Sequence, residues 1–137
     1  MAKGYWLMAA LLVVLVSCEK KDPSVNPGDT PDPQWKITVD TTDMTSSMTA
    51  IIQVSFTQSE GTLAAFMGDD CCGIAKHLEN LYWLYISPSA TSNVVQLKFY
   101  SPELKRIFVA KETFPFVNDG HLGSVSAPYT PTWNVTQ

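Results

Sequence analysis

The side chains with the most reactive chemistry in this sequence belong to two adjacent cysteines, Cys71 and Cys72. A redox-active or metal-binding pair normally has a spacing such as Cys-x-x-Cys, and that spacing is missing here. Neighbouring side chains of a strand point to opposite faces of its sheet. We therefore expect Cys71 to be buried as a small apolar residue and Cys72 to lie on the other face. Pairing of Cys72 with another molecule is the alternative.

Four residues near the cysteines have side chains of the types that bind metal ions, namely Asp69, Asp70, His77 and Glu79. The two aspartates are more simply explained as turn residues, because their carboxylates accept hydrogen bonds from the backbone of a tight turn. His77 and Glu79 come where a strand runs out toward solvent, and His121 follows a second turn. We therefore expect neither a metal site nor a cofactor.

The sequence does not contain the motifs of the common enzyme classes. It has two histidines and lacks the G-x-S-x-G, H-E-x-x-H and phosphate-binding-loop patterns. It also lacks a pair of carboxylates whose burial can be argued from the pattern of neighbouring residues. These observations favour a protein that is not an enzyme.

Aromatic side chains are the best candidates for ligand binding. The stretch LYWLYI, residues 81–86, is apolar on both faces, so all its rings are interior only if the strand is covered on both sides. Either Trp83 with Tyr85, or Tyr82 with Tyr100 from the next strand, would form a flat platform. A sugar ring or a partner protein can stack on such a platform. The alternative is that most of these rings form the core.

The C-terminal tail, APYTPTWNVTQ, adds aromatic residues that are less easily buried. Tyr129 and Trp133 either lie over one end of the domain or remain outside for a partner. The predicted ligand-binding residues are Tyr82, Trp83, Tyr85, Tyr100 and Trp133.

Short strands are expected to position these residues. Apolar and polar side chains alternate with a period of two in several runs, and turn signals rich in Gly, Pro, Asn and Asp separate the runs. Strands are predicted at 35–40, 52–57, 63–67, 71–76, 81–86, 95–99, 106–110 and 114–117. About eight short strands in residues 35–137 predict one all-β domain, an antiparallel β-sandwich of immunoglobulin-like type. A small barrel is the alternative.

The N-terminus has the pattern of a secretory signal. Lys3 precedes an apolar run of twelve residues, 5–16, which is shorter than the roughly 18 residues that a transmembrane helix needs. The sequence Leu15-Val16-Ser17-Cys18 then resembles the lipobox of bacterial lipoproteins. The resemblance implies that residues 1–17 are a signal peptide and that Cys18 is lipidated, which anchors the protein in a membrane.

Residues 18–34 are predicted to be a flexible tether. The stretch KKDPSVNPGDTPDPQ contains four prolines, one glycine and one apolar side chain, so it cannot bury enough surface to fold. After removal of residues 1–17 the chain has eight basic and thirteen acidic residues, a net charge of −5. This charge disfavours nucleic acid and anionic lipid as partners.

The stretches LAAFMGDDCCGIAKH, LYWLYI and VVQLKFYSPELKRIFVAKETFPFVNDGHLGSVSAP together resemble a β-sandwich module of Bacteroidetes cell-surface lipoproteins and secreted proteins. The resemblance runs from about Trp35 to Pro128. It departs at Cys72, where the module most often has arginine, so any contact made by that arginine is missing. The resemblance implies an outer-membrane lipoprotein at the cell surface, with the periplasmic face of the membrane as the alternative.

Taken together, the sequence predicts a membrane-anchored lipoprotein of the cell envelope with a non-catalytic binding module. Its ligand is expected to be a glycan or another envelope protein. The alternative is a structural or accessory subunit of an outer-membrane or fimbria-like assembly, which would self-associate or expose an unpaired sheet edge.

Overall fold

The structure is a computed structural model that describes residues 28–42 and 45–136. The predicted signal peptide (residues 1–17), the predicted lipidation site Cys18 and the first part of the predicted tether lie outside the described residues. Within the described ranges, no helix has the length and apolar character needed to cross a membrane.

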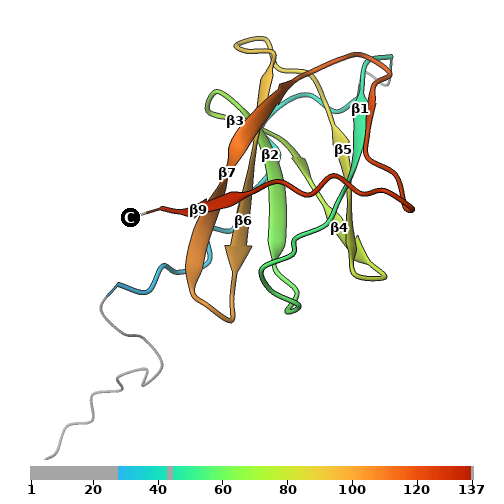
Figure 1. Cartoon of the computed structure of the whole chain (residues 1–137). Coiled ribbons are helices and arrows are strands. Elements are labelled where there is room, and N and C mark those ends of the chain that lie inside the picture. The colour runs from blue at the N-terminus through green and yellow to red at the C-terminus, as the bar shows by residue number, and fades with distance from the viewer. Residues whose placement is uncertain (1–27, 43–44, 137) are drawn as a thin grey trace, which may run out of the picture.

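The described chain consists of strands and connecting loops. In chain order the strands are β1 Met48–Ile52, β2 Thr62–Met67, β3 Asp70–Ile74, β4 Lys76–Leu78, β5 Leu81–Ile86, β6 Val94–Ser101, β7 Arg106–Pro115, β8 His121–Leu122 and β9 Trp133–Val135. They form a four-stranded sheet in the order β4-β5-β1-β8 and a five-stranded sheet in the order β3-β2-β6-β7-β9 (Figure 1). The strand pairs are antiparallel except β1 with β8, which is parallel.

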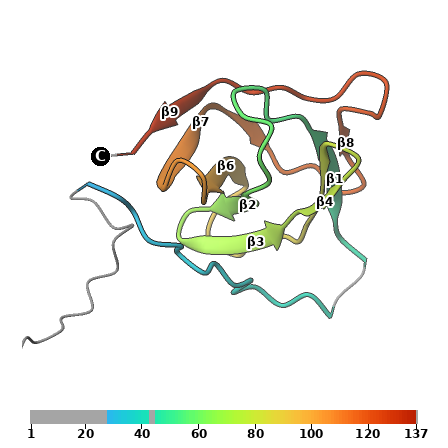
Figure 2. The same cartoon turned by 90° about the horizontal axis from the view of Figure 1, so that it is seen from below.

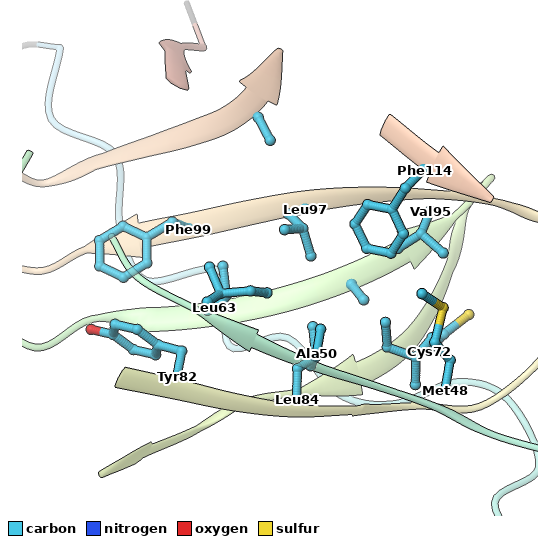
Figure 3. Packing of buried hydrophobic residues seen from close by; sticks show 14 of the residues in the cluster. Met48, Ala50, Leu63, Cys72, Tyr82, Leu84, Val95, Leu97, Phe99 and Phe114 are labelled. Atoms are coloured by element: carbon cyan, nitrogen blue, oxygen red, sulfur yellow. The ribbon is translucent and has the colours of Figure 1, made fainter. Parts of the chain in front are cut away.

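The prediction of an all-β sandwich is confirmed. Seen from below, the strands surround a common interior (Figure 2), and side chains from both sheets fill it (Figure 3). On β1, for example, Met48, Ala50 and Ile52 are buried while the residues between them are partly exposed. Burial of these apolar side chains is the main driving force for folding. The immunoglobulin-like topology stays a prediction.

Cys71 and Cys72 are both buried, on opposite faces of β3, and neither forms a disulfide. Cys72 lies in the main core between the sheets, whereas Cys71 belongs to a small outer cluster with Ala64 and Phe66. Removal from water disfavours the charged thiolate. Burial therefore raises the pKa of the Cys71 thiol, and it raises the pKa of the Cys72 thiol from 9.0 to about 11.

The strand predicted at 35–40 does not form. This segment runs over the outer face of the five-stranded sheet, where Trp35 packs against Phe66 with ring centroids 5.4 Å apart. The Thr38 N–H donates to the Cys71 carbonyl at 2.9 Å, but the Cys71 N–H donates to the Thr38 hydroxyl oxygen, also at 2.9 Å. A side-chain oxygen thus replaces a backbone acceptor, and no ladder develops.

The strand predicted at 52–57 has the wrong bounds. β1 pairs with β5 only as far as Ile52 opposite Tyr82, because β5 itself begins one residue earlier, at Leu81. Beyond this point the chain bonds to the C-terminal segment instead. The Gln53 N–H donates to the Tyr129 carbonyl, and the Tyr129 N–H donates to the Ile51 carbonyl, both at 2.9 Å.

The strand predicted at 106–110 and the first half of the one predicted at 114–117 form one strand, β7, which ends at Pro115. Its pairing with β6 contains a register shift near Gln96, whose side-chain amide donates to the Ala110 carbonyl at 2.8 Å. The sequence pattern does not predict β8 and β9. These strands are short, and they form because His121 meets Thr49 and Asn134 meets Val109, residues that are distant in the sequence.

The chain passes from one sheet to the other where β3 continues into β4. At this crossing Gly73 lies so close to β5 that a Cβ atom would collide with the carbonyl oxygen of Tyr85. The Ser87 N–H donates to the Cys72 carbonyl at 2.9 Å on the same side. Glycine at residue 73 therefore permits the two sheets to close at this corner.

The described end of the predicted tether contacts the domain. Residues 28–30 lie at the turn between β6 and β7, where the Asp29 carboxylate is 3.8 Å from the Lys105 Nζ and 3.5 Å from an Arg106 nitrogen. The Thr30 N–H donates to the Lys105 carbonyl at 2.9 Å, and Arg106 also donates to the Gly28 carbonyl. These contacts hold residues 28–30 against the turn between β6 and β7.

A substitution at the crossing tests its packing. Gly73→Ala is expected to lower the free energy of unfolding by about 2 kcal/mol or more, because the added methyl must displace backbone. Gly68→Ala is the comparison: its Cβ has room, but its φ of 62° is unfavourable for alanine, so about 1 kcal/mol is expected. Urea unfolding measures both values. An equal or larger loss for Gly68→Ala would contradict this account of the crossing.

The two thiols are expected to resist alkylation at pH 8 in the folded protein and to react once it is unfolded, as peptide mass spectrometry can report for each cysteine. Because the Cys72 thiol ionises near pH 9.0 when unfolded and near pH 11 when folded, its contribution to stability is constant below pH 9 and falls between pH 9 and 11. A Cys72→Ala variant should lose stability less steeply over that range. Rapid native alkylation of Cys72 would contradict its burial.

Candidate ligand-binding groove

The outer face of the four-stranded sheet carries exposed aromatic rings. On β5 the residues Tyr82, Leu84 and Ile86 point into the core, so the residues between them point outward. Trp83 is 37% exposed and Tyr85 is 49% exposed. Of the two platforms considered from the sequence, the structure places Trp83 and Tyr85 on one face.

The strand register arranges the outward side chains of this sheet in two adjacent rows. One row crosses β4, β5 and β1, and the other crosses β5, β1 and β8. The first row contains Lys76, Trp83 and Ile51, and the second contains Tyr85, Thr49 and His121. Residues directly opposite each other on neighbouring strands have Cβ atoms about 5 Å apart, so each row is a continuous strip of side chains.

These rows form the floor of an open groove of about 720 Å³, which the chain after β8 borders. The groove is lined by Thr49, Ala50, Ile51, Lys76, Trp83, Leu84, Tyr85, His121, Leu122, Gly123, Ser124 and Val125. Val125, which is 58% exposed, extends the apolar surface beyond β8. An apolar groove with a few polar groups at its margins is the usual form of a small-molecule site.

The groove has polar groups both beside its aromatic rings and at its margins. The Thr49 Oγ1 is 2.6 Å from the His121 Nδ1, a hydrogen bond that fixes the imidazole ring beside the sheet. Of the described residues that line the groove, Lys76 and His121 are those with basic side chains, and none is acidic. The groove therefore combines an aromatic floor with hydrogen-bonding and cationic edges.

Tyr82 does not take part in this groove. Its side chain is only 4% exposed, its ring lies 5.6 Å from that of Phe99, and its hydroxyl oxygen accepts a hydrogen bond from the Gly61 N–H at 3.0 Å. Burial raises the pKa of this hydroxyl, because the phenolate would lose its hydration. Tyr82 is part of the core (Figure 3).

Tyr100 lies on the outer face of the other sheet and is 6% exposed, so the structure does not bring it together with Tyr82. Its hydroxyl donates at 3.0 Å to the carbonyl of Thr30, a residue of the described end of the predicted tether. Burial raises the pKa of the Tyr100 hydroxyl. The position of Tyr100 indicates a role in holding this segment.

Trp133 packs against the edge of the core from β9. Its ring centroid is 6.1 Å from that of Phe99 and 6.2 Å from that of Phe56, and it borders a cavity of about 320 Å³. Of the two positions considered from the sequence, Trp133 therefore covers the domain rather than standing free. It is on the opposite sheet from Trp83 and Tyr85.

The residues considered as metal ligands are divided between two places. The Asp70 carboxylate accepts hydrogen bonds from the hydroxyls of Ser89 at 2.7 Å and Thr91 at 3.2 Å, which ties the start of β3 to the loop between β5 and β6. His77 stacks on Tyr82 with ring centroids 4.5 Å apart, and it lines a polar cleft of about 270 Å³. In the described part of the chain, no three His, Cys, Asp or Glu residues are grouped as a metal site.

Comparison with known proteins adds no relative. No family model, no curated protein and no solved structure matches this chain. The candidate groove therefore rests on its own geometry.

Sequence reasoning missed several groove residues, among them Thr49, Lys76 and His121. His121 is interpreted from the sequence as a loop residue, because a strand of two residues leaves no periodic signal. Only its pairing with β1 places it next to Thr49. The alternation of buried and outward residues along Met48–Ile52 would have identified Thr49 as an outward residue, but the predicted strand began only at residue 52.

The role of Tyr100 is testable through the amide of Thr30. Tyr100→Phe removes the hydroxyl that bonds to the Thr30 carbonyl, so the protection of the Thr30 amide against hydrogen exchange should fall about fivefold. Tyr82→Phe is the matched control, since its hydroxyl contacts Gly61 instead. Unchanged exchange at Thr30 in the Tyr100→Phe variant would show that other contacts hold the segment.

Proposed function

We propose that the protein is a lipoprotein of the bacterial outer membrane whose β-sandwich binds a glycan at the cell surface without catalysing a reaction. The anchor is the lipid expected at Cys18, and residues 19–27 link it to the domain. The observation that supports binding is the exposure of Trp83 and Tyr85 side by side over a groove of about 720 Å³. Aromatic rings offer a flat apolar face with a defined orientation.

The chemistry of the groove suits a saccharide better than a general apolar ligand. A sugar ring has an apolar C–H face and hydroxyl groups around its edge. The faces of Trp83 and Tyr85 match the first, while Thr49 beside Tyr85 and His121 and Ser124 at the margin match the second. A rigid sheet holds both rings in place, which limits the entropy lost on binding.

The size of the groove also favours a saccharide over a protein partner. A stable protein interface buries roughly 800 Å² on each partner, and that would require contacts well outside the groove. A short saccharide needs only the two rings and their neighbours. Trp83 and Tyr85 are two residues apart on β5, so their Cα atoms are about 7 Å apart and two neighbouring sugar rings can each meet an aromatic face.

The strand edges do not favour the alternative function as an assembly subunit. β4 has three residues, β8 has two and β9 has three, so each presents few backbone groups to another subunit. At the fourth edge, β3, both backbone groups of Cys71 are bonded to Thr38. Short and covered edges are the usual protection against edge-to-edge pairing.

A glycan array probed with the full chain in detergent tests the proposal. For each glycan that the unsubstituted protein binds, Trp83→Ala and Tyr85→Ala are each expected to weaken binding about tenfold, because each removes a stacking surface. Val94→Ala is the control: Val94 is 47% exposed on the five-stranded sheet, away from the groove, and its loss should leave binding unchanged. Binding that survives both aromatic substitutions would contradict this site.

A further inference from the structure

Charge distinguishes the groove from the rest of the molecule. The chain has thirteen acidic and nine basic residues. The groove nevertheless has Lys76 and His121 at its margins and no carboxylate among its described lining residues. An acidic protein that keeps carboxylates out of one aromatic groove presents a local environment that favours a negatively charged ligand.

Lys76 is available for such a ligand. Two other basic side chains already have partners: the Lys98 Nζ lies 4.6 Å from the centre of the Phe66 ring, and Arg106 pairs with Asp29. Lys76 is exposed and forms no ion pair with the described residues. It lies directly opposite Trp83 in the β4–β5 pair, so its ammonium group can reach the edge of a ring stacked on Trp83.

The two neighbours of Trp83 give the site a direction. On the β4 side the neighbour is Lys76, and on the β1 side it is Ile51. A carboxylate attached to a sugar projects from the edge of the ring, so a ring stacked on Trp83 with this group turned across the sheet places it over one of these two strands. Only the β4 side offers a positive charge, whereas the β1 side would remove water from the carboxylate without compensation.

The second row offers polar groups to the other end of a bound saccharide. Beside Tyr85 the neighbours are Thr49 and then His121, whose Nδ1 faces the Thr49 hydroxyl. When this hydroxyl donates to Nδ1, the ring proton is on Nε2, which remains a hydrogen-bond donor. These groups suit sugar hydroxyls on the ring that follows along the saccharide.

We propose that the ligand of this groove is an acidic saccharide, in which a sugar ring stacks on Trp83 and its carboxylate pairs with Lys76. This inference rests on the proposed function, since it names the class of glycan bound at the same site. The rings supply most of the affinity and Lys76 supplies the selection for charge, because an exposed ion pair contributes modestly and weakens as salt screens it.

The test uses oligogalacturonate, oligomannuronate and oligoglucuronate, each beside its methyl ester, which has the same rings without the charge. Binding to the full chain in detergent is measured by calorimetry. At least one acid is expected to bind about fivefold more tightly than its own ester at low salt. Lys76→Gln should abolish this preference and leave the affinity for the ester unchanged.

Lys111→Gln is the matched control, because it removes the same charge from an exposed position on β7, outside the groove. This variant should keep the preference for the acid. Thermal melting of both variants establishes that they are folded. A preference that survives in Lys76→Gln, or is lost equally in Lys111→Gln, would overturn the assignment to Lys76.

The remaining outcomes separate this inference from the proposed function. If the esters or the neutral glycans of the array bind as well as the acids, the acidic class is wrong and glycan binding stands. If no saccharide binds, both proposals fail. If poly-glutamate binds with the same dependence on Lys76 and no saccharide does, the groove recognises acidic peptides, which also overturns both.

Discussion

The structure depends most on the burial of one face of β5. Tyr82, Leu84 and Ile86 fill the space between the sheets, and β1 and β4 hold the strand in register on its two sides. Because side chains of a strand alternate, this burial commits Trp83 and Tyr85 to the surface. A shift of one residue would exchange the two sets and place the core residues in solvent. The groove is therefore a consequence of how the core is packed.

The two sheets have different outer faces, which divides the molecule into a covered side and an open side. Over the five-stranded sheet, Trp35 packs on Phe66, and the segment around Thr30 lies over Tyr100. The aromatic groove lies on the four-stranded sheet. Residues 28–30 thus contact the domain at the turn between β6 and β7, away from the four-stranded sheet (Figure 1). The rings of Trp83 and Tyr85 are exposed on that other sheet.

The thiols show how the same alternation governs residues without a binding role. Cys71 and Cys72 differ by one position, so one enters the outer cluster and the other enters the core. Both are removed from water, which raises the pKa of each thiol and favours its protonated form. The next residue is Gly73, because the chain passes close to β5 as it changes sheets and leaves no room for a Cβ atom. The CCG stretch is thus explained by packing on two faces and by the crossing.

The sequence by itself determined the all-β class, most strands, the opposite faces of Cys71 and Cys72, and the pairing of Trp83 with Tyr85 on one face, because a period of two is a local property. It did not determine the coverage of Tyr100, the packing of Trp133 at β9 or the approach of His121 to Thr49. Those depend on contacts between residues far apart in the chain. Only the tertiary structure decided which aromatic rings became core and which stayed exposed, since burial is set by what packs against each face.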